Sequence, residues 1–182
     1  EQYHADKLFS SINSEAVQVV AAKEDNAYKN VHLQRTVYML QLPGGRKIIA
    51  DIFHAASATE HQYDLPFQYS GNLINTSFKY NANTQQQKIL GKKNGYQFLW
   101  KEAEASLKDT LAQFTFLNKR TYYSISSLIE DSAQILFTRS GANDPTFNLR
   151  REPAANIRKQ GTNQSFINVI DIHGRCPHLI AY

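Results

Sequence analysis

The strongest constraint on the fold is the alternation of side chains along residues 61–73, which read HQYDLPFQYSGNL. Successive side chains of a strand point to opposite faces. One face would carry His61, Tyr63, Leu65, Phe67 and Tyr69, and the other would carry Gln62, Asp64, Pro66 and Gln68. Pro66 has no backbone N–H to donate, so the pattern predicts an edge strand or a bulge. Such mixed faces suit either a sugar-contacting groove or an ordinary sandwich wall whose polar groups are hydrogen-bonded.

Short strand-like segments recur along the rest of the chain. The expected strands cover residues 16–22, 33–42, 47–54, 72–80, 96–101, 113–117, 122–126, 134–139, 154–159 and 166–173. Two pairs of them predict hairpins, one around Pro43 to Gly45 and one around Asn118 to Arg120. Tyr and Phe number ten each, which also favours strands. The sequence therefore predicts an all-β fold, an antiparallel β-sandwich of about ten to twelve strands.

The 182 residues are enough for one domain with a full core. We expect residues 1–15 to form a loop or connecting arm, 16–174 the sandwich, and 175–182 a tail of unclear status. The chain starts with Glu1 and its only methionine is Met39, so we expect it to be part of something longer. The single cysteine, Cys176, excludes an intrachain disulfide.

Charge and motifs narrow the function classes. The net charge of +4 is scattered instead of forming a basic stripe, which argues against nucleic-acid binding. There is no stretch of membrane-spanning length, glycine-rich phosphate loop, nucleophile elbow or zinc-protease motif. The six histidines are His4, His32, His54, His61, His173 and His178, and their wide spacing supports no metal site.

The candidate substrate-binding residues are Arg139, Asn143, Asp144, Arg150, His61 and Tyr63. An arginine with amide side chains at a strand-to-loop junction is suited to gripping the carboxylate of an acidic sugar. The alternative is that Asn143, Asp144 and Pro145 form a turn that ties the loop together. Tyr63, Tyr69, Phe98 and Trp100 would either stack on sugar rings or fill the core. His61 and Asp64 are expected on opposite faces, so no His–carboxylate pair forms without a bulge.

Several motifs resemble the C-terminal part of heparinase II/III-like proteins, most closely the oligoalginate lyases of polysaccharide lyase family seventeen. They are HQYDLPFQYSG at 61–71, YQFLWKEA at 96–103, FTRSGANDP at 137–145 with FNLR at 147–150, and DIHG at 171–174. The resemblance implies a two-part lyase, in which an N-terminal α/α toroid precedes a large β-sandwich. Tyrosine and histidine would exchange protons with a uronate whose carboxylate is neutralised, giving β-elimination.

The family's H-x-H-x-D run and H-N-T segment, which supply its catalytic and zinc-binding groups, are absent from this sequence. We therefore transfer no catalytic residue or cofactor to this chain and expect it to be inactive alone, with zinc confined to a full-length family enzyme. The resemblance also implies an acidic polysaccharide as ligand, a toroid partner, a homodimer and a bacterial periplasmic or secreted setting. The alternative function is a non-catalytic carbohydrate-binding or structural sandwich.

Overall fold

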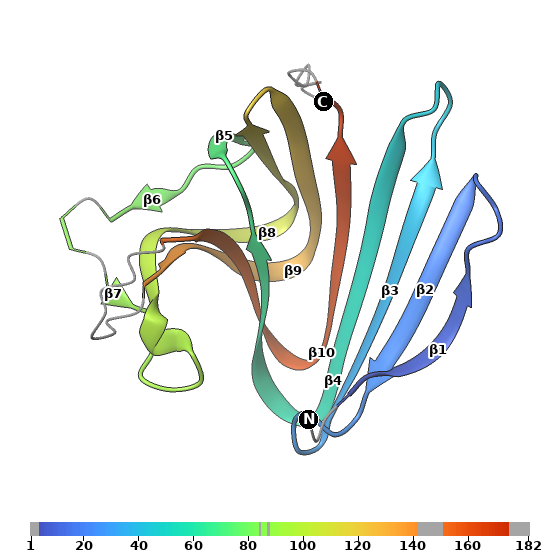
Figure 1. Ribbon diagram of the computed structural model, residues 1–182. Helices are drawn as coiled ribbons and strands as arrows, with labels where there is room; N and C mark the ends of the chain where they lie inside the picture. The colour runs from blue at the N-terminus through green and yellow to red at the C-terminus, as the bar shows by residue number, and fades with distance from the viewer. Residues whose placement is uncertain (1–3, 84, 87, 142–150, 175–182) are drawn as a thin grey trace.

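The computed structural model describes residues 4–83, 85, 86, 88–141 and 151–174 as one antiparallel sheet that bends over itself (Figure 1). Its strands are β1 (Asp6–Ser11), β2 (Val17–Glu24), β3 (Val31–Gln41), β4 (Lys47–Gln68), β5 (Asn72–Thr76), β6 (Asn81–Ala82), β7 (Lys88–Ile89), β8 (Leu99–Asn118), β9 (Thr121–Ser140) and β10 (Pro153–Ile172), and a 3-10 turn, η1 (Tyr96–Phe98), precedes β8. The hydrogen-bonded order is β1-β2-β3-β4-β10-β9-β8-β5, and β6 and β7 each pair with β8. The predicted all-β, antiparallel fold class is confirmed.

Four long strands, β4, β8, β9 and β10, pass through both halves of the bent sheet and are 20 to 22 residues long. The pairing register between neighbouring long strands shifts at about the same distance along them. In β10 the shift against β4 falls between Gly161 and Asn163, and in β8 the shift against β9 falls between Lys108 and Thr110. Extra residues on one strand of a pair increase its local bend and twist. The two halves therefore become the two layers of a sandwich, joined by continuous strands. The first layer contains β1 to β3 and residues 47–57, 110–118, 121–129 and 163–172 of the long strands, and the second contains their residues 61–68, 99–108, 132–140 and 153–161.

The core lies between these layers and is rich in aromatic side chains. Phe114 and Phe116 come from the half of β8 in the first layer, and each is at most 1% exposed. Phe137 of β9 faces them from the second layer, with its ring centroid 6.1 Å from that of Phe114. The ring centroids of Tyr69 and Phe116 are 4.5 Å apart. Contacts of this kind join the two layers. The bend brings the rings together, and their packing in turn stabilises the bend.

Residues 63–67, in the segment that most constrains the fold, show the predicted alternation of buried and more exposed side chains. Tyr63, Leu65 and Phe67 are buried, whereas Pro66 on the opposite face is exposed. Residues 61–68 pair with β10, and over the described residues no other strand pairs with this part of β4. The position of Pro66 on an edge strand is thus confirmed, because the missing N–H removes no ladder bond there.

The outer face of the first layer carries an unusual number of apolar side chains. Residues paired directly across its strands form one row, which we call the apolar row: Phe9, Ala21, Thr36, Ile52, Ile167, Leu128 and Leu111. Leu128 is 39% exposed and Leu111 is 56% exposed. Phe9 and Ile52 are also partly exposed, at 49% and 37%, whereas Ala21 is fully buried. No helix in the described part of the chain is long and apolar enough to cross a membrane.

The structure corrects several strand boundaries. Residues 6–11, expected in a loop, form the fully exposed edge strand β1. Residues 96–98, expected in a strand, form the turn η1. Residues 47–54 and 61–68 are one strand, as are 122–126 with 134–139 and 154–159 with 166–172. The predictions divided these long strands because an inserted residue at the bend changes the phase of the alternation.

Lys159 lies at this bend with its side chain inside the sandwich. It is 4% exposed, its Nζ donates a hydrogen bond of 2.5 Å to the backbone oxygen of Ser165, and it stands 5.3 Å from the ring centroid of Phe166. Burial lowers the pKa of Lys159, and the carboxylates of Glu130 and Asp131 oppose that shift. The charged amine is therefore disfavoured in the folded state relative to the unfolded one.

This burial predicts a pH dependence of stability. Between the lowered pKa and the ordinary lysine value of about 10.4, the unfolded chain binds a proton that the folded chain does not. The free energy of unfolding should therefore rise with pH through that window. The change Lys159→Met should remove this rise, whereas Lys29→Met, at an exposed position, should keep it. Urea denaturation between pH 7 and pH 10.5 measures the difference, and an unchanged slope in Lys159→Met would contradict the assignment.

Candidate functional site

Arg139 stands next to the last residue of β9, at the end of the second layer. Its Nε donates to Oε1 of Glu102 at 2.6 Å, and its Nη2 donates to Oε2 at 3.2 Å. Glu102 is available for this pair because the register of β8 shifts between Lys101 and Ala103. The hydrogen bonds to Glu102 raise the pKa of Arg139 above its ordinary value. Arg139 is therefore a permanent cation, held in a fixed direction but still partly open to solvent, at 36% side-chain exposure.

Three aromatic side chains lie at the same end of the second layer as this ion pair. Trp100 pairs directly opposite Arg139 in the ladder and is 37% exposed. Tyr69 lies within electrostatic reach: burial raises its pKa, while the charge of Arg139 lowers it. Tyr80 contacts the core at Phe137, with a centroid distance of 5.2 Å, and is 45% exposed. We call Arg139, Glu102, Trp100, Tyr69 and Tyr80 the arginine rim.

The rim has the chemistry of a site for acidic sugars. A guanidinium recognises a carboxylate through two parallel N–H donors. Half-exposed aromatic rings offer flat apolar surfaces to the C–H face of a pyranose, and tyrosine adds a hydroxyl. A carboxylate ligand would have to compete with Glu102 for the guanidinium, so the rim favours ligands that bring several contacts at once.

The other predicted site residues do not join the rim. Tyr63 is 9% exposed and donates its hydroxyl proton to Oγ of Ser57 at 3.1 Å, as a wall residue would. His61 is exposed and lies 3.2 Å from Oγ1 of Thr59. Along β10 the partner of His61 is Gly161, whereas the partner of Arg139 is Pro153. Eight residues of strand separate these levels by on the order of 25 Å.

Asn143, Asp144 and Arg150, which the sequence placed beside Arg139, lie outside the described residues. Of the aromatic set, Tyr63 belongs to the core, Tyr69 and Trp100 belong to the rim, and Phe98 is 47% exposed in η1. The alternation of Tyr69 and Trp100 within strand patterns could not distinguish rim from core, because both positions face inward and only their place at the end of the layer exposes them.

A second polar cluster, which the sequence did not predict, lies on the outer face of the second layer. Asp64 accepts two hydrogen bonds from Arg158, at 2.8 Å from Nε and 2.7 Å from Nη2, and a third from the hydroxyl of Tyr96 at 2.6 Å. Side-chain exposure is 9% for Asp64 and 17% for Arg158. Burial, and then the bond to Asp64, raise the pKa of Tyr96. The cluster fixes η1 against the edge strand, so its role is structural.

In the ranges that the structure describes, no three side chains from His, Cys, Asp and Glu come close enough together to hold an ion.

Comparisons with known proteins agree on one class. The chain is 32% identical over 177 residues to an exo-oligoalginate lyase of Saccharophagus degradans, which covers 94% of this chain and 24% of the relative. It is 34% identical over 159 residues to an alginate lyase of Stenotrophomonas maltophilia, covering 86% of this chain and 21% of the relative. The chain thus spans about a quarter of the length of these curated relatives. No family model matches.

The fold also occurs in a solved structure. The heparan sulfate lyase HepC from Pedobacter heparinus superposes with a TM-score of 0.60 over 96% of this chain and 23% of its own, at 12% identity. At that identity the likeness shows the fold alone. The sequence relatives confirm the resemblance to alginate-degrading polysaccharide lyases.

Proposed function

We propose that this chain, which is related in sequence to the alginate lyases, is the C-terminal β-sandwich portion of an enzyme that cleaves uronate polysaccharides by β-elimination. The observation that carries the proposal is the identity of 32% to an exo-oligoalginate lyase along 94% of the chain. The arginine rim adds a chemical reason, because it combines a fixed cation with exposed aromatic rings.

In this proposal the sandwich binds substrate and does not perform the proton transfers. Arg139 would face a uronate carboxylate, and Trp100 and Tyr80 would contact the sugar ring. The groups that abstract the C5 proton, and any zinc, would belong to parts that the relatives carry beyond the matched span. The isolated chain would then bind alginate oligomers without turning them over.

The apolar row supports a further part of the proposal, a helical toroid domain as partner. Leu111 and Leu128 expose apolar surface on a flat sheet face, where packing against another domain would remove it from water. A homodimer and a periplasmic or secreted setting also belong to the proposal by family resemblance. Mixing the chain with a toroid domain of a related lyase, and repeating the mixture with Leu128→Glu, tests the surface by loss of association.

The rim gives a direct prediction for ligand binding. The change Arg139→Ala should weaken the affinity for an alginate trisaccharide by roughly ten- to a hundredfold, because a charge-assisted hydrogen bond contributes roughly 1.5–3 kcal/mol. Trp100→Ala should weaken it by a similar factor through loss of the ring surface. Titration calorimetry measures both, with Lys29→Ala, an exposed lysine in the turn before β3, as the charge-matched control. Equal affinity in Arg139→Ala and the control would remove the rim from the site.

Turnover separates this proposal from a stand-alone binding or structural sandwich. Formation of an unsaturated uronate is followed by ultraviolet absorbance with alginate oligomers as substrate. We expect no product from the chain alone and product after a toroid-containing part of the enzyme is added. Product from the chain alone would contradict the claim that the sandwich only binds substrate. No product from the mixture would favour a sandwich without a lyase role.

A further inference from the structure

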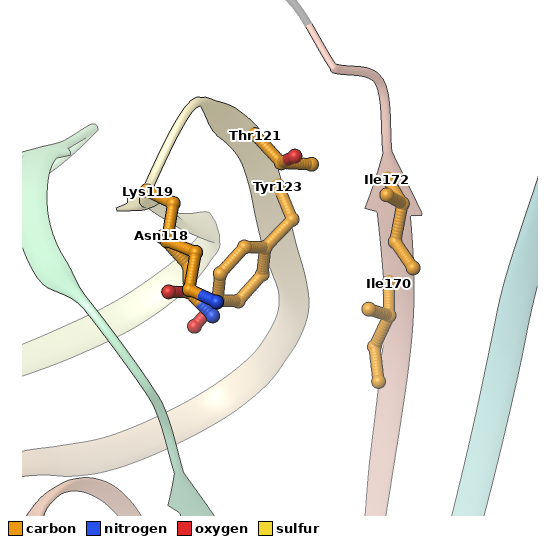
Figure 2. Close-up of a pocket in the computed structure, with 6 residues that line it drawn as sticks. All are labelled: Asn118, Lys119, Thr121, Tyr123, Ile170 and Ile172. Carbon is orange, nitrogen blue, oxygen red and sulfur yellow. The ribbon is translucent and has the colours of Figure 1, made fainter.

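A pocket of about 510 Å³ opens beside the β8–β9 hairpin, at the end of the first layer (Figure 2). Its lining residues are Asn118, Lys119, Thr121, Tyr123, Ile170 and Ile172. The first three come from the turn between β8 and β9, and the isoleucines come from the last residues of β10. The volume lies within the range of about 300–1,000 Å³ that is usual for sites that bind small molecules.

One wall of the pocket is apolar and rigid. The ring of Tyr123 stacks on Phe116 at 5.0 Å between centroids and 22° between planes, and its hydroxyl donates to the backbone oxygen of Ser70 at 3.0 Å. These two contacts fix the ring from both ends. Figure 2 shows Ile170 and Ile172 on the neighbouring strand, facing the tyrosine across the opening. An aromatic ring with aliphatic neighbours suits the C–H face of a sugar.

The opposite lip is polar and cationic. Lys119 stands in the left-handed region, at φ 57°, at the tip of the hairpin, and the amide of Asn118 and the hydroxyl of Thr121 flank it. Within the part of the chain that the structure describes, the ion pairs leave Lys119 without a carboxylate partner. This differs from Arg139, whose charge is already paired with Glu102. A free cation above an apolar wall selects an anion that has an apolar face.

We infer that this pocket is a second binding site for one uronate residue of an acidic oligosaccharide. Phe116 lies between Tyr123 of the pocket and Tyr69 of the arginine rim, so the two sites are neighbours. The carboxylate lies at Nζ of Lys119, the ring lies against Tyr123 and Ile170, and Asn118 and Thr121 bond the hydroxyl groups. The choice of a uronate rests on the proposed function. Two neighbouring sites would let the domain hold an oligosaccharide at two points, which raises its apparent affinity for long chains over short ones.

Backbone amide resonances of the ¹⁵N-labelled chain test the inference. Alginate trisaccharide should shift the amides of residues 118–123 and 170–172 in a saturable way, and maltotriose, a neutral sugar of the same length, should not. Lys119→Asn keeps a residue that tolerates the left-handed turn and should weaken this binding about tenfold. Ile172→Trp should fill the pocket and abolish it. Lys29→Asn is the matched control, and thermal melting confirms that each variant is folded.

Three results would overturn the inference. They are no shift at these amides up to millimolar trisaccharide, equal shifts with maltotriose, and shifts with octanoate, an anion without a sugar ring, in place of shifts with the trisaccharide. The same spectra separate it from the proposed function, because Trp100 and Arg139 report the rim. Shifts at the rim without shifts at the turn would refute the second site and leave the lyase proposal in place. Shifts at the turn without shifts at the rim would support the second site and remove the rim from the substrate-binding surface.

Discussion

Replacing Gly71 with alanine is expected to destabilise the sandwich by more than about 3 kcal/mol. Gly71 joins β4 to β5 at φ 91°, and an added Cβ would come within 2.2 Å of the backbone oxygen of Leu117 and 2.8 Å of the Cα of Asn118. Two costs therefore combine: the left-handed backbone disfavours a side chain, and the clash is with backbone atoms that cannot rotate away. The β8–β9 hairpin would have to move.

Gly95 provides the matched control. It has a similar φ of 86°, but nothing lies within 4 Å of an added Cβ. Gly95→Ala should therefore carry the conformational cost alone, about 1 kcal/mol. Urea unfolding of the two variants isolates the contribution of close packing. Equal losses would show that the contact between Gly71 and the hairpin is looser than the structure indicates.

The change Asp64→Ala is expected to cost about 3 kcal/mol, because it leaves the guanidinium of Arg158 buried without a counter-charge. Asp64 also accepts the hydroxyl bond of Tyr96, so its loss should free η1 from the edge strand. Chemical denaturation gives the loss of stability, and hydrogen exchange should show faster exchange across residues 90–98. No increase there would contradict the view that this cluster holds the turn.

Two comparisons sharpen this test. The double change Asp64→Leu with Arg158→Leu removes both charges and should recover most of the lost stability. Asp25→Ala breaks an ion pair with Lys23, 2.8 Å long but exposed, and should leave the unfolding curve unchanged within error. A double variant as unstable as Asp64→Ala would mean that the hydrogen bonds, and not the charge balance, are what the cluster contributes.

Much of the local structure could be read from alternation and turn residues. The hairpins around residues 43–45 and 118–120 and the edge position of Pro66 were predicted correctly, since each depends on neighbours in sequence. The short strand β1 was missed because all six of its side chains are exposed, which leaves no apolar period to detect. The continuity of the long strands was missed because the bulges reset the period at the bend.

The site was less predictable for the same reason. Arg139 was a candidate from its place before a loop, but its partner Glu102 comes from another strand, at a register shift that no local pattern signals. His61 and Tyr63 were equally plausible as substrate-binding residues from the sequence. They lie near the bend, at the end of the second layer away from Arg139. Asp64, Arg158 and Tyr96 are 32 or more residues apart along the chain and gave no sign of their association.

By itself the sequence determined the fold class, the edge strand and the kinship with polysaccharide lyases, because strand alternation, turn residues and the order of the motifs can all be read along the chain. Only the tertiary structure decided which polar groups meet. The pairing of the long strands places Arg139 with Glu102 and Asp64 with Arg158. Such pairings depend on the cross-strand register, which is fixed by packing across the core and not by neighbours in sequence.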